Sequence, residues 1–503
     1  MPYSRKYAII ILTLLLAFSF HLPVYAQSSD QEKPRNVILF IGDGMGPNQV
    51  KAAQVYAREV LNRELVIGSI NISGTTTTHS ASSKVTDSAA AATAIYSGFK
   101  TKNGQLNVLP DGTTAEGIGM AAKKAGLSVG IVSTARITDA TPAALYAISS
   151  NRGSHNEIAV QLPDFMADVV LGVGSKHFAP SSHKGSDRKD ETDVIALMKE
   201  KGYEYVENLK ELKAVQPGQI QRLFGMFSSG DMPFAIDRKN NPGLSHMPTL
   251  ADMTSAAITM VEKNPKGFLL VVEGGRIDHA CHANDIKTMI EETLEFDDAV
   301  AVGLKFQKTH PETLVIVTAD HETGGLKRLG EGEFSMDPKA LEVITRSLGH
   351  VEDKIRRHPD QIRNQLKAAG FELTPEESEL LESYMAKASE DKLAGKNAAD
   401  KSAKHDKSGS LRALSKITSQ RSKIEWASNG HTDHHIITRA IGPGAKMFEG
   451  NYDNTDIAIK IARLLNLSIP ALKEKKASRL LTIPAMAYYF QKSEKACHGI
   501  ALG

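Results

Sequence analysis

Apolar runs that end directly in polar, glycine-containing loops recur along the chain. Four segments share this pattern, and they cover residues 36–46, 128–144, 268–279 and 313–325. Runs of this length without alternation of apolar and polar positions are typical of strands that are buried on both faces of a mainly parallel sheet. We therefore predict a buried strand in each segment, with a polar loop at its carboxyl end.

Patterns typical of helices lie between these strands, at residues 114–126, 249–263 and 286–306. The alternation of strand and helix predicts an α/β fold with a doubly wound, mainly parallel central sheet flanked by helices. In such sheets the ligand site lies beyond the carboxyl ends of the strands. The four polar loops are therefore expected to meet at one edge of the sheet, although they lie far apart in the sequence.

The character of the chain changes between about residues 331 and 426. This segment is charged, poor in β-branched runs, and contains a Lys-, Ser- and Ala-rich stretch of low complexity near residues 394–410. We predict a helical insertion here, in a domain that covers residues 27–467. The apolar pattern of the sheet returns at residues 434–442, and a basic tail follows at residues 468–503.

The first 26 residues have the organisation of a signal peptide. Arg5 and Lys6 precede an apolar run, and small residues stand before Gln27, where we expect cleavage. The alternative is an uncleaved anchor, because residues 7–24 are nearly long enough to span a bilayer. No second run reaches that length, so we expect a periplasmic or secreted protein without stable membrane insertion after cleavage.

Charge and cysteine content narrow the class of protein further. Removal of residues 1–26 takes away Arg5 and Lys6 and no acidic residue, which leaves equal numbers of basic and acidic residues. A balanced charge argues against nucleic acid as a specific partner. Cys281 and Cys497 are the two cysteines of the chain; they lie in very different regions, and we expect two free thiols.

Candidate metal ligands follow the apolar run of residues 268–272. Glu273, Asp278 and His282 stand close together there, and Asp278 and His282 are four residues apart, so they share a face if a helical turn follows the strand. Carboxylate oxygens and imidazole nitrogens on rigid supports are what a hard or borderline metal cation needs. A mixture of nitrogen and oxygen ligands is typical of zinc.

Other strand ends carry similar residues. Asp43 follows the first apolar run, and a single aspartate in that position is more often a helix cap than a metal ligand. The third glycine of a dinucleotide-binding loop would fall on Pro47, which argues against that class of site. Several clusters at the ends of predicted strands are harder to explain as caps; the remaining ones are Asp320 with His321, and His431 with His434 and His435.

Ser88 is the candidate nucleophile. It stands at the front of an alanine-rich stretch with high helix propensity, where a helix N-terminus stabilises an anion. A plain N-cap role for Ser88 or Asp87 is the alternative. No G-x-S-x-G elbow is present, so coordination to a metal is a possible means of activating the hydroxyl. Arg152 is a candidate phosphate clamp, because its guanidinium group offers planar, bidentate geometry.

The ordered motifs resemble those of the alkaline phosphatase family. They are DGMG, TDSAAAATA, STARITDATPAA, VEGGRIDHACH, TADHETGG and GHT, and the similarity runs from about residue 36 to residue 465 apart from the insertion. This resemblance implies a homodimeric phosphoserine enzyme with two zinc ions and one magnesium ion. It also implies hydrolysis of phosphate monoesters with broad alcohol specificity and an alkaline optimum.

The resemblance implies roles for individual residues. Ser88 matches the nucleophile, and Arg152 the phosphate-binding arginine. Position 279 is a histidine, as in animal members, whereas Asp139 is of the bacterial type, and His279 is a candidate substrate-binding residue. The implied ligands are Asp278, His282 and His431 for one zinc; Asp43, Asp87, Asp320 and His321 for the other; and Asp139, Thr141 and Glu273, with Asp43 bridging, for magnesium.

Three alternative functions are weighed for the same residues. A phosphodiesterase on this scaffold is the nearest alternative, and a periplasmic metal-binding protein without turnover is a second. A sulfatase would need the pattern C/S-x-P-x-R, which the chain lacks. Ser88 and Arg152 would serve no purpose in a protein that only stored metal, which favours an enzyme.

Overall fold

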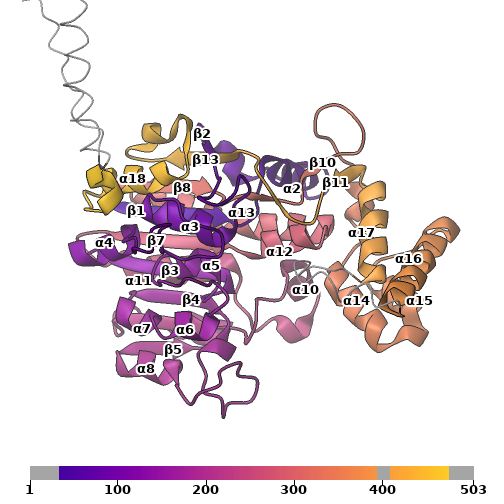
Figure 1. Cartoon of the computed structure of the whole chain (residues 1–503), viewed down its shortest axis with the longest axis horizontal. Coiled ribbons are helices and arrows are strands. Elements are labelled where there is room, and N and C mark those ends of the chain that lie inside the picture. Colours follow the sequence, from indigo (N-terminus) through magenta and orange to yellow (C-terminus); the bar gives the residue numbers. More distant parts are fainter. Residues whose placement is uncertain (1–32, 394–407, 475–503) are drawn as a thin grey trace, which may run out of the picture.

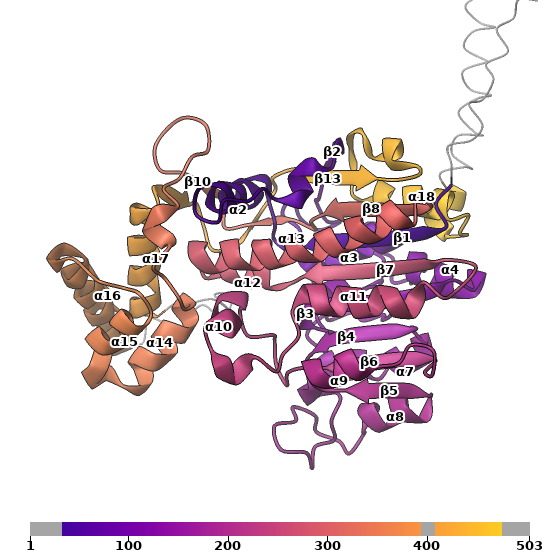
Figure 2. The same cartoon turned by 180° about the vertical axis from the view of Figure 1, so that it is seen from behind.

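A ten-stranded sheet forms the centre of the molecule (Figures 1 and 2). The computed structural model describes residues 33–393 and 408–474. From one edge to the other, the strands are β14 (Gly450–Asp453), β2 (Ile72–Thr77), β13 (Ile436–Ile441), β8 (Thr313–Thr318), β1 (Asn36–Gly42), β7 (Phe268–Gly274), β3 (Ser128–Arg136), β4 (Val169–Val173), β6 (Arg222–Met226) and β5 (Tyr203–Val206).

All strands of this sheet run parallel except β13, which is antiparallel to both of its neighbours. The four strands predicted from apolar runs are adjacent, in the order β8, β1, β7 and β3. Every residue of β1, β7 and β8 is buried, which explains why their sequences do not alternate. The predicted fold, a doubly wound and mainly parallel sheet flanked by helices, is confirmed.

Helices cover both faces of the sheet and enclose two apolar layers. In β1, Ile38 and Phe40 face one layer, while Val37 and Leu39 face the other. One face carries α3 (Ser88–Ser97), α4 (Ile118–Ala125), α5 (Ala140–Ala143), α6 (His155–Ala159), α7 (Leu162–Phe165), α8 (Val194–Glu200) and α18 (Thr455–Leu464); the other carries α2 (Pro47–Glu59), α9 (Leu209–Ala214), α10 (Ala235–Lys239), α11 (Leu250–Val261) and α13 (Ile286–Thr309) (Figures 1 and 2).

In the described parts of the segment predicted to be a helical insertion, residues 331–393 and 408–426, four α-helices lie beside the α/β core (orange, Figure 1). Two short antiparallel strands, β10 (Leu326–Arg328) and β11 (Ile424–Trp426), pair where the chain leaves and re-enters the core. The backbone N–H of Leu348 donates to the Asp285 carboxylate over 2.7 Å and ties the helices to α13. The four helices are α14 (Leu348–Arg357), α15 (Ile362–Ala368), α16 (Pro375–Leu393) and α17 (Gly409–Arg421).

Other sequence predictions concern residues outside the described part of the chain. These are the signal peptide of residues 1–26, Cys497 and most of the basic tail. Cys281 is buried and is a free thiol. Within residues 33–393 and 408–474, none of the helices combines the length and the apolar character needed to cross a bilayer.

Candidate metal centre

The predicted ligands meet at the carboxyl edge of β8, β1, β7 and β3. Asp43 follows β1, and Asp320 and His321 follow β8. Glu273 is the penultimate residue of β7, and α12 (Arg276–His282) carries Asp278 after it. The turn between β7 and α12 lies so close to β3 that a Cβ atom on Gly275 would come within 2.6 Å of Ala135, so glycine is needed there.

One group of ligands consists of Asp278, His282 and His431. His282 Nε2 lies 3.2 Å from Asp278 Oδ2 and 3.1 Å from His431 Nε2. The Nδ1 atom of each ring faces a backbone carbonyl, that of Asn429 for His282 and that of Thr86 for His431. A carbonyl only accepts, so Nδ1 carries a proton in both rings, and the two Nε2 atoms are turned towards each other and towards Asp278. A shared cation would relieve this contact.

A second group consists of Asp43, Asp320 and His321. His321 Nε2 lies 3.2 Å from Asp320 Oδ2 and 3.7 Å from Asp43 Oδ1. Both of these carboxylate oxygens are buried and accept no hydrogen bond within the described part of the chain. Buried acceptors without donors are costly. The donor set therefore fits a divalent cation.

Backbone groups fix the second group in place. The N–H groups of Gly44 and His321 donate to Asp320 Oδ1 over 3.1 and 2.9 Å. Gly44 has a φ of +69°, and a Cβ atom there would lie 2.8 Å from Asp278 Oδ1. Both observations require glycine. The DGMG motif thus serves close packing of the two ligand groups.

The buried carboxyl groups influence one another strongly. Burial and the nearby Asp320 raise the pKa of Asp43 well above its usual range. Burial, with Asp278 beside it, raises the pKa of Asp320 to about 7. Burial also raises the pKa of Asp278, but His282 outweighs it and holds that pKa well below its usual range. So much negative charge in a dry site favours a bound cation.

Glu273 and Thr141 form the part of the site nearest β3. Burial raises the pKa of Glu273 to about 8, and a hydrogen bond from the Ser133 hydroxyl opposes this shift. The Thr141 hydroxyl also acts on the Glu273 carboxyl, yet it is buried without a hydrogen bond of ordinary geometry in the described chain. These two side chains and Asp43 offer oxygen atoms only, which suits magnesium.

Arg152 is held by two carboxylates. Its Nη1 atom donates to Asp87 Oδ2 over 3.1 Å, and its Nη2 atom donates to Asp139 Oδ1 over 2.9 Å. Each terminal nitrogen carries two N–H bonds, so one on each remains for a ligand. The guanidinium group is therefore presented as a fork that suits a tetrahedral oxyanion.

Asp87, predicted as a ligand of the second metal, forms hydrogen bonds through both of its oxygens. Its Oδ1 atom accepts the N–H of Ala90 over 3.0 Å and caps α3, and its Oδ2 atom accepts the N–H of Gly104 over 2.9 Å as well as Arg152. Both oxygens are thus in use, and Asp87 lies outside the two ligand groups. In this arrangement Asp87 caps α3 and binds Arg152, and its role as a ligand of the second metal stays a prediction.

Asp139 is engaged in a similar way. Its Oδ2 atom accepts Arg136 over 2.8 Å, and Oδ1 accepts the N–H of Ala140 over 2.7 Å in addition to Arg152. Burial acts to raise its pKa, but the arginines outweigh this and hold it well below the usual range. Arg136 also binds Asp231 over 3.0 Å. Sequence reasoning missed Arg136 and Asp231; the position of Arg136 three residues before Asp139 was the available signal.

Ser88 lies where these groups converge. It is the first residue of α3 and is 3 % exposed, and its Oγ atom lies 3.2 Å from His321 Nε2. The family resemblance implied that His321 belongs to the metal site that activates Ser88, and the fold brings the two residues together although they are 233 positions apart. The serine hydroxyl therefore faces the second ligand group from the positive end of a helix.

Comparison with known proteins now decides the family. A family model described as alkaline phosphatase matches residues 34–467. The chain belongs to the alkaline phosphatase family. It is 32 % identical over 457 residues to alkaline phosphatase 3 of Bacillus subtilis, which covers 88 % of this chain and 91 % of the relative. The enzyme is therefore an alkaline phosphatase, and it hydrolyses phosphate monoesters.

Solved structures that are similar to this chain are also alkaline phosphatases. The alkaline phosphatase of Thermus thermophilus is 30 % identical with a TM-score of 0.76, and the match covers 88 % of this chain and 96 % of that one. A variant of the TAB5 alkaline phosphatase, from an Antarctic bacterium, was solved with Mg in its M3 site. That chain is 25 % identical with a TM-score of 0.61, over 87 % of this chain and 99 % of its own.

The remaining histidines lie at the margin of the site in this alkaline phosphatase. The Nδ1 atom of His279 contacts the guanidinium group of Arg276, and burial together with that cation lowers the pKa of His279 to about 4. His434 is exposed and contacts the Thr432 hydroxyl over 2.8 Å. His431, predicted from the GHT motif alone, is the histidine of this segment that the ligand groups include.

Proposed function

We propose that the enzyme cleaves phosphate monoesters through a phosphoserine at Ser88, with two zinc ions and one magnesium ion bound beside it. The observation that carries this proposal is the position of Ser88 Oγ, 3.2 Å from His321 Nε2. His321 belongs to the second ligand group, with Asp43 and Asp320, and a ring nitrogen of His321 also lies within 4.8 Å of ligand atoms of Asp278 and His431 in the first group. A nucleophile at this point would be next to both bound cations.

The chain offers a suitable ligand set for each ion. Cations at these positions would lower the pKa of the serine hydroxyl and offset charge on the attacking and leaving oxygens. Asp139 would stay with Arg136 and Arg152 and influence the magnesium site from a distance. The residues that would hold the ions are Asp278, His282 and His431 for the first zinc; Asp43, Asp320 and His321 for the second; and Asp43, Thr141 and Glu273 for magnesium.

Ser88 and Arg152 would act in two chemical steps, formation of the phosphoserine and its hydrolysis. Ser88 Oγ attacks phosphorus in line with the ester oxygen, so a Ser88 O–P bond forms and the alcohol departs with a proton. Water then attacks phosphorus from the side that the alcohol has left, the Ser88 O–P bond breaks, Ser88 Oγ regains a proton from the water, and inorganic phosphate leaves. Arg152 neutralises the nonbridging oxygens with its two remaining N–H groups in both steps.

Little in this geometry contacts the alcohol, so we expect broad specificity towards leaving groups. An alkaline optimum would follow because the serine must lose its proton. We also propose export to the periplasm or outside, from the segment of residues 1–26, and a homodimer. Cell fractionation and light scattering of the purified enzyme test these two points.

The first experiment compares the enzyme with its Ser88→Ala variant and with a chelated sample. Hydrolysis of p-nitrophenyl phosphate at alkaline pH should fall in the variant by at least ~10³-fold. Metal content, measured by mass spectrometry, should remain at two zinc ions and one magnesium ion. Chelation should abolish activity, and zinc with magnesium should restore it. An active Ser88→Ala variant with its metals in place would exclude the phosphoserine route.

Phosphodiester hydrolysis is the alternative with the same residues. A diester carries one fewer charged oxygen, so the fork of Arg152 would lose a partner. We therefore expect bis-p-nitrophenyl phosphate to be a poor substrate beside p-nitrophenyl phosphate. A higher kcat/KM for the diester would show that the alcohol side of the site, rather than Arg152, sets specificity.

A further inference from the structure

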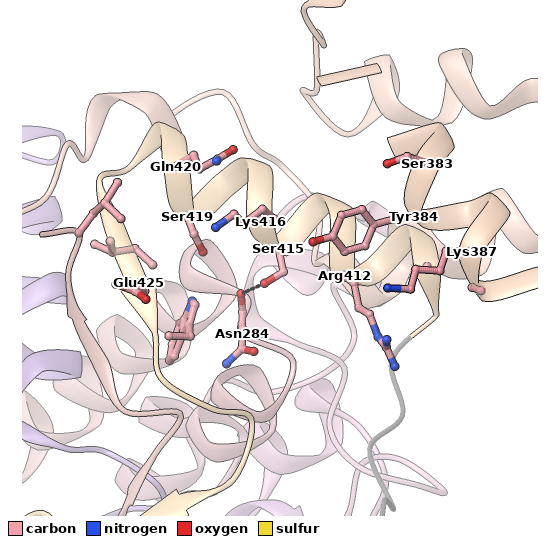
Figure 3. A pocket seen from close by; sticks show the side chains of 15 residues that line it. Asn284, Ser383, Tyr384, Lys387, Arg412, Ser415, Lys416, Ser419, Gln420 and Glu425 are labelled. Carbon is pink, nitrogen blue, oxygen red and sulfur yellow. Dashed lines mark hydrogen bonds between the residues drawn. The ribbon is translucent and has the colours of Figure 1, made fainter. Parts of the chain in front are cut away.

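A cavity of about 660 Å³ lies between the helical insertion and the strand β11, apart from the metal centre (Figure 3). We call it the insertion pocket. Helices α16 and α17 form its two long walls, and residues 424–426 form its floor. None of the residues assigned above to metals or phosphate lines it. Its size falls in the range of small-molecule sites.

The walls of the insertion pocket carry excess positive charge. Lys387 projects from α16, and Arg412 and Lys416 project from α17, one helical turn apart (Figure 3). Glu425 is the acidic residue among the lining side chains, and it lies 3.6 Å from Lys327. Within the described part of the chain, Lys387 and Lys416 form no ion pair. The pocket therefore attracts anions.

Helical spacing makes this polar wall continuous. Residues 412, 415, 416 and 419 follow one another at intervals of three and one, so α17 presents a single stripe to the cavity. The opposite side of α17 packs into the apolar core through Ala413 and Leu414. Ser383 and Tyr384 of α16 add hydroxyl groups across the cavity (Figure 3). The helix is thus anchored by one face and leaves its polar stripe to the pocket.

Trp426 lines the floor of the insertion pocket. Its Nε1–H group is buried and has no hydrogen-bond partner among the described residues. This nitrogen is not accessible from the cavity, so the indole gives the pocket apolar surface and a fluorescent reporter. The ring packs against Gly324, where a Cβ atom would come within 2.5 Å of the indole. Trp426 is the single tryptophan of the chain.

The pocket also adjoins the loops that hold the metal ligands. Asn284, which lines it, lies two residues after His282, and its carbonyl accepts the Ser415 hydroxyl over 2.9 Å. The Asn284 side chain donates to the carbonyl of Ser428 over 2.8 Å, in the segment that leads to His431. A ligand in the pocket would therefore lie directly behind these two histidine loops.

We propose that the insertion pocket binds a small organic polyanion that carries several oxyanionic ester groups. The cations stand on two facing helices, so a ligand with more than one charged group matches them better than a single small ion. Hydroxyl donors between them suit ester oxygens. This binding site is separate from the catalytic one and is independent of the route by which the enzyme cleaves esters.

The probe for this proposal is myo-inositol hexasulfate, which contains no phosphate ester for the enzyme to cleave. We expect saturable binding to the metal-loaded enzyme by calorimetry, with a matching change in the emission of Trp426. Affinity should fall as salt rises, because the contacts are ionic. The double variant Arg412→Gln with Lys416→Gln should bind at least tenfold more weakly.

Two matched variants make the result decisive. Arg363→Gln with Lys367→Gln removes the same charge at the same spacing from exposed positions of α15, outside the pocket, and should change affinity less than twofold. Arg152→Ala disables the phosphate clamp and should also leave probe binding unchanged. Absence of saturable binding, equal losses in the two charge pairs, or loss of binding in Arg152→Ala would each overturn the proposal.

Discussion

At the scale of single residues, two carboxylates of the site keep a buried oxygen that accepts no hydrogen bond in the described part of the chain. Asp43 and Asp320 each leave a buried carboxylate oxygen without a donor, and His282 and His431 turn their Nε2 atoms towards each other. Such groups are stable together only around cations. Asp87 is different, because hydrogen bonds occupy both of its oxygens. The same residue type is therefore saturated by donors at one position and left with an open oxygen at two others.

Substitution of Asp87 separates the two roles that were considered for it. Asp87→Ala should keep the full zinc content, because neither oxygen faces the ligand groups. It should lower stability by roughly 1 kcal/mol through loss of the helix cap, and raise KM through a less constrained Arg152. Asp320→Ala is the matched control and should lose zinc. Loss of zinc in Asp87→Ala would restore its assignment as a ligand.

Arg152 should contribute mainly to recognition of the phosphoryl group. Arg152→Ala is expected to lower kcat/KM for p-nitrophenyl phosphate by roughly 10- to 10³-fold and to weaken inhibition by inorganic phosphate, because the forked contact is lost. Arg152→Lys should recover only part of the kcat/KM that Arg152→Ala loses, since an ammonium group cannot form the forked contact. Equal activity in Arg152→Lys and the parent enzyme would contradict bidentate binding.

At the scale of elements, α13 supports the site from behind the sheet. It packs against β1 through an edge-on contact of Phe296 with Phe40, with ring centroids 6.1 Å apart. Glu292 on this helix is buried and accepts the N–H of Ala235 over 2.7 Å. Burial, with Glu295 nearby, raises the pKa of Glu292 to about 7. A long buried helix thus holds an acid that titrates near neutrality.

This acid gives a pH-dependent stability. Glu292 has a higher pKa in the folded than in the unfolded chain, so the folded state is favoured at low pH and loses stability as pH rises from about 4.5 to about 7. Glu292→Gln keeps the acceptor for Ala235 and removes the charge. The free energy of unfolding of Glu292→Gln relative to the parent should therefore increase between pH 5 and 8, by up to ~3 kcal/mol. The difference in melting temperature between the two proteins should increase with it.

An exposed acid provides the control for that measurement. Glu379→Gln, on the surface of α16, should differ from the parent by the same small amount at every pH in that range. A Glu292→Gln variant whose melting temperature runs parallel to that of the parent from pH 5 to 8 would show that Glu292 stays ionised when buried.

At the scale of the whole molecule, the metal centre joins parts of the chain that no local interaction connects. Loops after β1, β7 and β8, the start of α3 and the segment before β13 meet at one edge of the sheet. Without cations, the carboxyl groups of Asp43, Asp278, Asp320 and Glu273 repel one another across this junction. Bound metals should therefore stabilise the entire domain and not the site alone.

Chelation should lower the melting temperature of the enzyme by roughly 5–10 °C, since ligands that bind only the folded state stabilise it in proportion to their binding. Zinc and magnesium should reverse the change, which calorimetry can follow. Asp43→Asn with Asp320→Asn, which removes two of the charges, should be less sensitive to chelation. Identical melting of loaded and chelated enzyme would show that metals play no structural part.

Much of this architecture followed from the sequence. Buried parallel strands have uninterrupted apolar runs, so the segments that became β1, β3, β7 and β8 were visible without coordinates. The long helix α13 was predicted at residues 286–306 and extends over Ile286–Thr309. The short edge strands β5 and β14 lack such runs and were not foreseen, because their pairing depends on neighbours rather than on their own composition.

What the sequence determined by itself was the class of fold and the residue types of the site, since burial and ligand chemistry are properties of short segments. Only the tertiary structure decided which carboxylates face a cation and which are consumed by backbone donors, as the contrast between Asp320 and Asp87 shows. It also decided that His321 lies beside Ser88. These contacts join residues hundreds of positions apart, and their geometry is set by the order of strands in the sheet rather than by local pattern.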